Sequence, residues 1–230
     1  MSTSRIVLAL VVALLFGCAA PLFAQTVPPA TQEQEQELIA VLESDAPQKE
    51  KADACRGLGL IGSKDAVPAL AALLGDEKLS HMARYGLEPI PDPSVDDALR
   101  EALGKLKGLP LVGVIGSIGV RGDAEAVAPL IEMLRGSDQE VATAAARSLG
   151  RIATPEAAGA LEAMLAEAPR PLRLVVADGC LACAEALLAQ GKRNEAAAMY
   201  GKVGQADLPK HFRIAAAYGA LQARRPAGNP

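Results

Sequence analysis

Apolar residues recur at helical spacing along most of the chain, in short segments that polar turns separate. The segments DAVPALAALL and DAEAVAPLIEML show this most clearly. Both place apolar residues at positions i, i+3 and i+7, which lie on one face of an α-helix. These residues are Val67, Leu70 and Leu74 in the first segment, and Val127, Leu130 and Leu134 in the second. The pattern predicts a series of short amphipathic helices.

A longer unit repeats around these helices. In each copy a helix ends near the motif Leu-Gly-x-Ile, a polar turn follows, and a second helix carries leucines at helical spacing. The first residue of the motif, here called the anchor, is Leu58, Leu87, Ile115 and Leu149 in successive copies, and Cys180 continues the series. A two-helix period of about 30 residues, as in this series, is typical of an α-solenoid, because each helix pair must stack on its neighbours to bury its apolar face. We therefore predict an all-α, right-handed α-solenoid of stacked helical hairpins.

The segment LVGVIGSIGV, residues 111–120, is open to a second interpretation. Its β-branched residues favour a buried strand, and its glycines each cost a helix on the order of 1 kcal/mol. However, it occupies the anchor-helix position of a repeat, with Ile115 and Ile118 at the motif positions. We predict a helix here.

Turn chemistry supports the same boundaries. Asp65, Asp123 and Thr154 precede second helices, where their side chains can accept hydrogen bonds from free backbone N–H groups. Pro155 follows Thr154 as a first-turn proline. The copy anchored at Leu87 differs, because its turn reads EPIPDPSVD. Its three prolines end the helix and predict a rigid, distinct turn.

The motifs Leu58-Gly-x-Ile61, Ile115-Gly-x-Ile118 and Leu149-Gly-x-Ile152, with the helices that follow them, resemble the HEAT-repeat family. The resemblance is to the short bacterial form related to the phycobilisome-lyase repeats, and it covers roughly residues 48–189. It implies a scaffold or binding platform, and some members of the family assist cofactor attachment or protein maturation.

The C-terminal part changes style. The segment AEALLAQGKRNEAAAMYGKV, residues 184–203, is similar to a tetratricopeptide unit, and a further helix follows from about Pro209. An array that ends on such a helix leaves an apolar face open, so that helix either caps the array or meets a partner.

The N-terminus has the pattern of an export signal. One positive charge, Arg5, precedes an apolar run over residues 6–16, and small residues lead to Ala24 before Gln25. We expect cleavage after Ala24. The alternative is a lipobox in LFGC, with Cys18 lipidated and a membrane contact only in that case. The predicted segments are an export signal (1–24), a polar linker with the first helix (25–46), HEAT-like repeats (47–183), the tetratricopeptide-like hairpin and final helix (184–223), and a disordered tail (224–230).

Composition narrows the function. The 230 residues are 50% hydrophobic but only 3% aromatic, and the formal net charge is −4. This composition provides neither a basic field for nucleic acid nor aromatic platforms for stacking bases or sugars. Nucleotide-binding, serine-hydrolase and zinc-protease motifs are missing from the sequence. We expect no catalytic residues, cofactor or metal.

Cys180 and Cys183 form the one Cys-x-x-Cys motif. Ala184 follows where haem attachment needs histidine, and the ligand spacing of a zinc site is missing. Because both cysteines lie within a predicted helix, we interpret them as packing residues. A disulfide or reactive thiol pair is the alternative in an exported protein.

These observations predict an exported, non-catalytic scaffold that binds a protein or peptide partner, in the periplasm or cell envelope of a bacterium. The alternative is an accessory or maturation subunit of an envelope enzyme, which could be a redox enzyme. The second helices and the turn near Leu87 are the expected binding surface. The candidate interaction residues are Arg84, Tyr85, Glu88, Asp97, Arg100 and Arg135.

Overall fold

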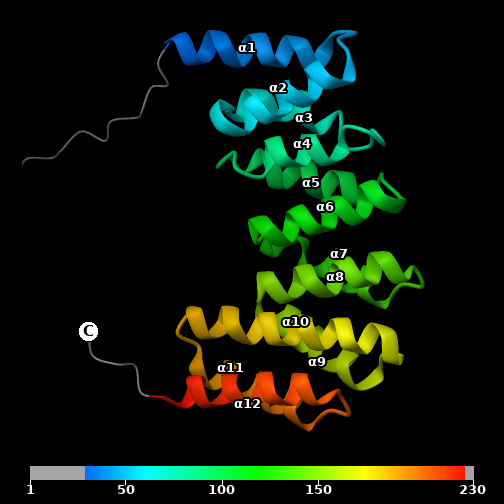
Figure 1. Ribbon diagram of the computed structural model, residues 1–230, viewed down its shortest axis with the longest axis vertical. Helices are drawn as coiled ribbons and strands as arrows, with labels where there is room; N and C mark the ends of the chain where they lie inside the picture. Colours follow the sequence, from blue (N-terminus) through cyan, green and yellow to red (C-terminus); the bar gives the residue numbers. More distant parts are fainter. Residues whose placement is uncertain (1–28, 226–230) are drawn as a thin grey trace, which may run out of the picture.

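The computed structural model describes residues 29–225, which form α-helices and short 3-10 turns with no strand (Figure 1). This confirms the all-α solenoid. The export signal and Cys18 lie outside the described residues. The elements are α1 (Pro29–Glu43), α2 (Gln48–Ile61), η1 (Lys64–Ala66), α3 (Val67–Ala71), α4 (Ser80–Leu87), α5 (Ser94–Leu103), α6 (Gly108–Arg121), η2 (Ala124–Ala126), α7 (Val127–Arg135), α8 (Gln139–Ile152), α9 (Pro155–Glu167), α10 (Arg170–Ala189), α11 (Arg193–Gln205) and α12 (Lys210–Arg224).

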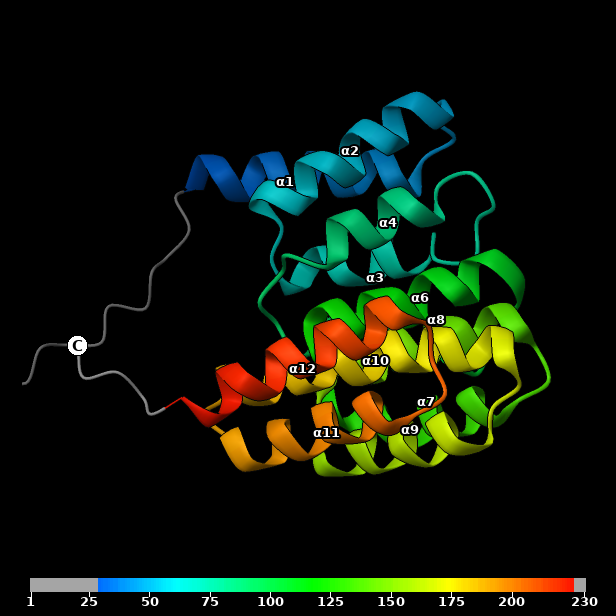
Figure 2. The same ribbon diagram turned by 60° about the horizontal axis from the view of Figure 1, so that its bottom comes forward.

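The helices form two layers. The even-numbered helices stack on one another from α2 to α10, and each packs against the odd-numbered helix that precedes it. Figure 2 separates the layers, with α6, α8 and α10 on one side of α7 and α9. The core runs between the layers along the whole array. The anchors Leu58, Leu87, Ile115, Leu149 and Cys180 all lie in this core and are fully buried, so the anchor of each of the five motif copies is a core residue.

Residues 108–121 are helical, as the repeat register predicted, and the helix tolerates its glycines because neighbours use the space. A side chain at Gly119 would collide with Ser148 of α8, whose hydroxyl donates a 2.7 Å hydrogen bond to the carbonyl of Ile115. Val114 and Ile118 of the same helix are fully buried. Tertiary contacts therefore outweigh the low helix propensity of this segment.

The helix starts agree with the sequence at two of three predicted caps. The Asp123 and Thr154 side chains accept hydrogen bonds from backbone N–H groups two and three residues further on, and Pro155 lies in the first turn of α9. The prediction for Asp65 is wrong. Ser63 is the cap, and its hydroxyl accepts from the Asp65 N–H at 3.2 Å, because the turn closes two residues earlier than the pattern indicated.

Residues 25–46 were predicted to hold a polar linker and the first helix, and the part that the structure describes is helical from Pro29 to Glu43. Helix α1 begins at Pro29 and includes the Gln- and Glu-rich stretch. Glu35 is buried, and its carboxylate accepts a 2.5 Å hydrogen bond from the Ser63 N–H across the first hairpin. Gln and Glu are good helix formers, and this hydrogen bond, together with Leu42 in the core, ties the helix to the array.

The final helix is packed rather than isolated. Tyr200 of α11 lies where a side chain at Gly219 of α12 would be. Arg193 donates hydrogen bonds to the carbonyls of Gln222 and Ala223, which close the C-terminal end of α12. Helix α12 also packs against α10. Residues 183 and 184, the predicted boundary between the two repeat types, both lie inside α10. No helix in the described range is long and apolar enough to cross a bilayer.

Candidate functional site

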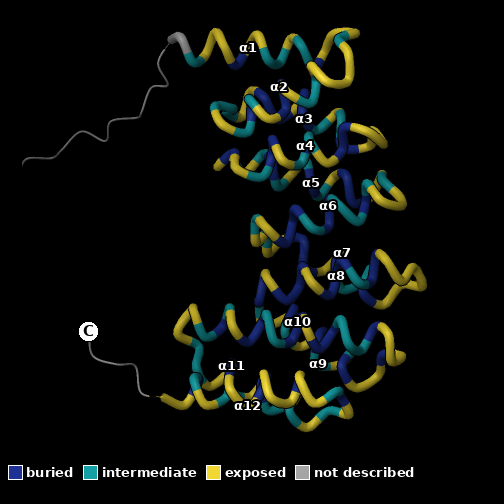
Figure 3. The backbone as a smooth tube through the Cα atoms, viewed as in Figure 1, coloured by how far each residue is buried: buried dark blue, intermediate teal, exposed yellow. Residues whose placement is uncertain are grey.

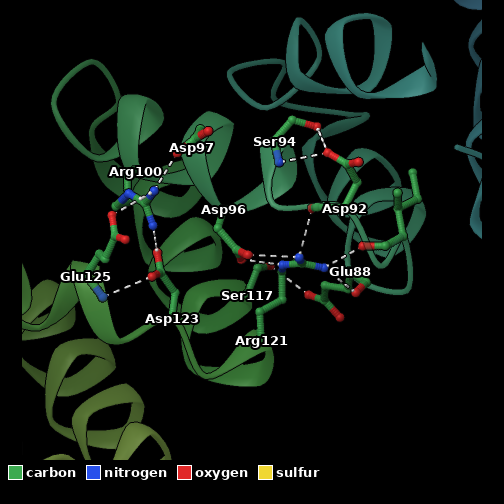
Figure 4. A network of polar contacts seen from close by, with 11 residues as sticks. Glu88, Asp92, Ser94, Asp96, Asp97, Arg100, Ser117, Arg121, Asp123 and Glu125 are labelled. Carbon is green, nitrogen blue, oxygen red and sulfur yellow. Dashed lines mark hydrogen bonds and ion pairs between the residues drawn. The ribbon is translucent and has the colours of Figure 1, made fainter. Parts of the chain in front are cut away.

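The Pro-rich turn between α4 and α5 is held by one arginine of α6. Arg121 donates hydrogen bonds to the carbonyls of Glu88 (3.0 Å), Ile90 (2.8 Å) and Asp92 (3.2 Å). The same guanidinium binds both carboxylate oxygens of Asp96 (Figure 4). The prolines of the turn have no backbone N–H to donate and restrict its conformation. The guanidinium of Arg121 provides hydrogen-bond donors to the backbone carbonyls of the turn. Arg121 therefore ties the turn to α6, and the rigidity that its prolines predict stays a prediction.

Two further contacts join α4 to α6. The Ser117 hydroxyl donates a 2.6 Å hydrogen bond to the Glu88 carboxylate. The Arg84 guanidinium lies over Gly113, whose carbonyl accepts a hydrogen bond at 3.3 Å. A side chain at Gly113 would come within 2.5 Å of Arg84 Cζ, so the glycine is what admits the guanidinium.

The electrostatics of Arg84 are unusual for an arginine near the surface. Burial lowers its pKa, and the charge of Glu88 partly opposes that shift. Its Nε is buried and has no hydrogen-bond partner among residues 29–225. Arginine remains protonated at neutral pH even so, which places a partly desolvated positive charge between α4 and α6.

Arg100 forms a second polar cluster on the odd-numbered layer. It pairs with Asp97 one turn earlier, with Asp123 at 2.5 Å and with Glu125 at 3.2 Å. Burial lowers the pKa of Arg100, but the hydrogen bond to Asp123 and the surrounding carboxylates outweigh it, so the pKa is raised. This cluster joins α5 to η2 and fixes the spacing of neighbouring repeats (Figure 4).

The structure does not bring the six candidate interaction residues together in one site. Arg84 and Glu88 contact α6, while Asp97 and Arg100 contact each other. Tyr85 is 54% exposed. Arg135 lies on α7. Its one ion pair within the described residues is with Glu132 of the same helix, at 3.6 Å. Sequence reasoning missed Arg121, Asp96 and Ser117, because each bonds a residue at least 25 positions away.

A second surface was also missed. Within residues 31–225, every large apolar side chain that is exposed lies on an even-numbered helix. The odd-numbered helices from α3 onward are the second helices of the repeats, where we expected binding. Within the same residues they expose no large apolar side chain. Four of these side chains belong to neighbouring helices and are called the even-face patch: Leu60 of α2, Tyr85 of α4, and Leu109 and Val120 of α6.

The solvent side of α6 is the most unusual part of this patch. Leu109 is 75% exposed and Val120 is 57% exposed. Gly116 lies between them, with open space around it. The one hydroxyl residue in residues 109–120, Ser117, is buried and bonded to Glu88. A solvated helix face normally carries polar side chains, but this one has none.

The cysteines are core residues. Cys55, Cys180 and Cys183 are fully buried free thiols. Burial raises the pKa of Cys180 to about 12, and the neighbouring Cys183 and Glu162 add to the shift. Burial likewise raises the pKa of Cys183 and of Cys55 to about 11 each. Such thiols are poor nucleophiles and ligands. The described residues contain no group of His, Cys, Asp and Glu that could hold a metal ion.

A family model described as HEAT repeats matches residues 35–107 and 112–179. The chain belongs to the HEAT-repeat family. The matched residues end inside α10, one residue before Cys180. The matched residues include both clusters of Figure 4 and, apart from Leu109, the even-face patch.

Two solved structures are similar to this HEAT-repeat chain. One is the complex of CpcE and CpcF of phycocyanin lyase from Nostoc sp. PCC7120, at 22% identity over 86% of this chain and 78% of that chain, with a TM-score of 0.46. The other is an engineered protein, at 20% identity over 83% of this chain and 96% of that chain, with a TM-score of 0.46. No curated protein matches the chain significantly.

Proposed function

We propose that this protein is an exported, non-catalytic HEAT-repeat scaffold that binds a protein partner on its even-numbered helices. The observation that carries the proposal is the solvent face of α6, where Leu109 and Val120 are exposed beside the bare backbone of Gly116. Contiguous exposed apolar surface rimmed by polar residues is characteristic of interaction sites. The glycine lets a partner approach the helix backbone closely.

The rim of this surface is positively charged. Arg84 lies over Gly113 on one side of the α6 face. Arg147 and Arg151 are exposed on α8, the next even-numbered helix. The partner that fits has apolar residues at its centre and carboxylates at its edge. Leu109 also lines a surface hollow of about 750 Å³, between the α3–α4 and α5–α6 turns, which could accept a projecting side chain.

Internal bonding of the polar clusters supports a non-catalytic role. Arg121 and Arg100 use their donors on carboxylates and carbonyls of the same chain. Export to a bacterial periplasm or envelope is supported by residues 1–24 alone. The mass of the protein purified from its host tests this, because an N-terminus at Gln25 supports cleavage, a lipidated Cys18 supports the alternative, and an intact Met1 contradicts export.

Site-specific photo-crosslinking tests the binding surface. A photoreactive residue in place of Val120 should give one discrete adduct in the host cell, and the same residue in place of the exposed Ala163 of α9 should not. Adding Leu109→Gln should weaken the Val120 adduct about tenfold. Equal adducts at both positions, or none at Val120, would contradict the proposal.

A further inference from the structure

The two ends of the array have different outward surfaces. At the N-terminal end, the exposed side of α1 carries Glu33, Gln36 and Glu37 beside Ala40. This is the polar face that a terminal repeat needs for solubility. At the C-terminal end, α12 has exposed positions along its length (Figure 3), and three of them carry large apolar side chains. These are Ile214 (58% exposed), Tyr218 (65%) and Leu221 (64%).

Helix α12 is apolar on two opposite sides. The side that packs on the array is buried and includes Phe212, Ala216, Gly219 and Ala223. The three exposed residues follow at positions i, i+4 and i+7, so they form a single stripe on the other side. A helix that is apolar on both sides is normally covered on both, yet the described chain covers only one.

The charges on α12 itself are all of one sign. Lys210, Arg213, Arg224 and Arg225 are exposed, and residues 210–225 contain no Asp or Glu. None of these four side chains forms an ion pair within the part of the chain that the structure describes. The protein as a whole has a formal net charge of −4. Helix α12 is therefore a local basic, amphipathic surface on an acidic protein.

We propose that α12 docks on an anionic lipid bilayer and lies in the plane of its surface. The stripe of Ile214, Tyr218 and Leu221 would enter the boundary between headgroups and acyl chains, as amphipathic helices with basic flanks do. The four cations would lie at the level of the lipid phosphates, where each one strengthens adsorption. A tyrosine within the stripe suits this interface, because its ring is apolar and its hydroxyl is polar.

The charges disfavour a second copy of the chain as the occupant. Antiparallel pairing of two α12 helices would bring Lys210 and Arg213 of one copy beside Arg224 and Arg225 of the other, and like charges repel. The acidic α1 end of a second copy would match the charge. However, Ala40 is the one apolar residue among its exposed positions 32–43, so it would leave the stripe without apolar contacts.

Vesicle flotation of the chain from Gln25 onward tests the proposal, because this chain lacks Cys18 and any lipid on it. With vesicles of phosphatidylcholine and phosphatidylglycerol in a two-to-one ratio, we expect binding at least tenfold stronger than with phosphatidylcholine alone. The triple change Ile214→Gln, Tyr218→Gln and Leu221→Gln should reduce binding at least tenfold. The triple change Lys210→Gln, Arg213→Gln and Arg224→Gln should do the same.

Matched controls come from α8 and α6. The double change Arg147→Gln and Arg151→Gln removes exposed cations elsewhere and should leave vesicle binding unchanged. So should Leu109→Gln with Val120→Gln, which separates this proposal from the scaffold function. Circular dichroism melting confirms that each variant is folded. A Tyr218→Trp reporter should shift its emission to shorter wavelength with the anionic vesicles.

Three outcomes would overturn the proposal. The first is no binding to anionic vesicles by the unaltered chain. The second is binding that the α12 changes leave intact. The third is a concentration-dependent oligomer that the apolar triple change dissolves, which would make a second copy the occupant of the stripe.

Discussion

Arg121, the last residue of α6, forms a two-point ion pair with Asp96 of α5, in which Nη2 and Oδ2 are 3.0 Å apart. The same guanidinium reaches three carbonyls of the Pro-rich turn. One side chain therefore connects α4, the turn, α5 and α6. This clamp sets the position of Arg84 and Tyr85, which lie on α4 just before the turn.

Removing this clamp should destabilise the array. Arg121→Met keeps much of the apolar stem but leaves the carbonyls and Asp96 without their donor. We expect the free energy of unfolding to fall by about 2–3 kcal/mol, as for charged hydrogen bonds that are largely protected from water. Arg121→Lys should recover only part of this loss, because an ammonium cannot reproduce the planar fork. Urea unfolding measures the effect, and Arg151→Met, at an exposed arginine, is the control.

Glycines at the contacts between helices should resist enlargement. A Cβ at Gly150 of α8 would lie 2.5 Å from the carbonyl oxygen of Gly179 in α10. Because the atoms it would meet are backbone, Gly150→Ala should cost about 1–3 kcal/mol. Gly116→Ala, where nothing lies within 4 Å, should instead stabilise the helix by about 0.5–1 kcal/mol. Thermal melting of the two variants should shift in opposite directions, and equal shifts would contradict the close packing.

The buried thiols should react only after unfolding. Cys180, with a pKa of about 12, and Cys55 and Cys183, with pKa values of about 11, stay protonated in the folded chain at pH 8. We expect an aromatic disulfide reagent to label none of them within minutes in buffer, and all of them in guanidinium. Rapid labelling of Cys180 in the folded state would favour a redox role instead.

The same pKa shifts set a pH dependence. A thiol whose pKa is raised by folding binds its proton more tightly in the folded chain. Its contribution is complete below the pKa of the unfolded thiol, about 8.5, and is lost as pH rises toward 11–12. The free energy of unfolding of the unaltered chain should therefore fall more steeply between pH 9 and 11 than that of Cys180→Ala with Cys183→Ala.

The N-terminal helix should depend on one carboxylate. Glu35→Ala removes the acceptor of the Ser63 N–H, which should cost about 1 kcal/mol because a partly buried donor loses its protein partner. The loss should be local and appear as faster amide exchange across α1. Glu37→Ala, at an exposed position of the same helix, should change the exchange little. If both variants behave alike, the contact does not hold α1.

Much of the fold could be predicted because its signals are local. The motif at Leu58 and Leu149 recurs together with its turn, and Thr154 precedes Pro155 as a helix cap should. The register placed even the Gly-rich residues 111–120 correctly. The polar composition of residues 25–46 did not show where the first helix begins, although Gln and Glu favour helices and Leu38 and Leu42 continue the helical spacing.

The candidate site was less accessible to such reasoning. Arg84 and Glu88 could be noted beside an unusual turn, but their partners Gly113 and Ser117 lie one repeat further on. The binding role of the six candidate residues remains a prediction. The exposed face of α6 was hidden for a different reason, since Leu109 and Val120 resemble core residues until the orientation of the helix is known.

By itself, the sequence determined the helices, their repeat period and the buried anchors, because these depend on spacing within one repeat and its immediate neighbour. Only the tertiary structure decided which apolar residues stay in contact with solvent. The side of a helix that is covered depends on how neighbouring repeats stack, and glycine contacts such as Gly150 with Gly179 set that stacking. The same packing buries Cys180 in the core and leaves Leu109, Tyr218 and Leu221 exposed.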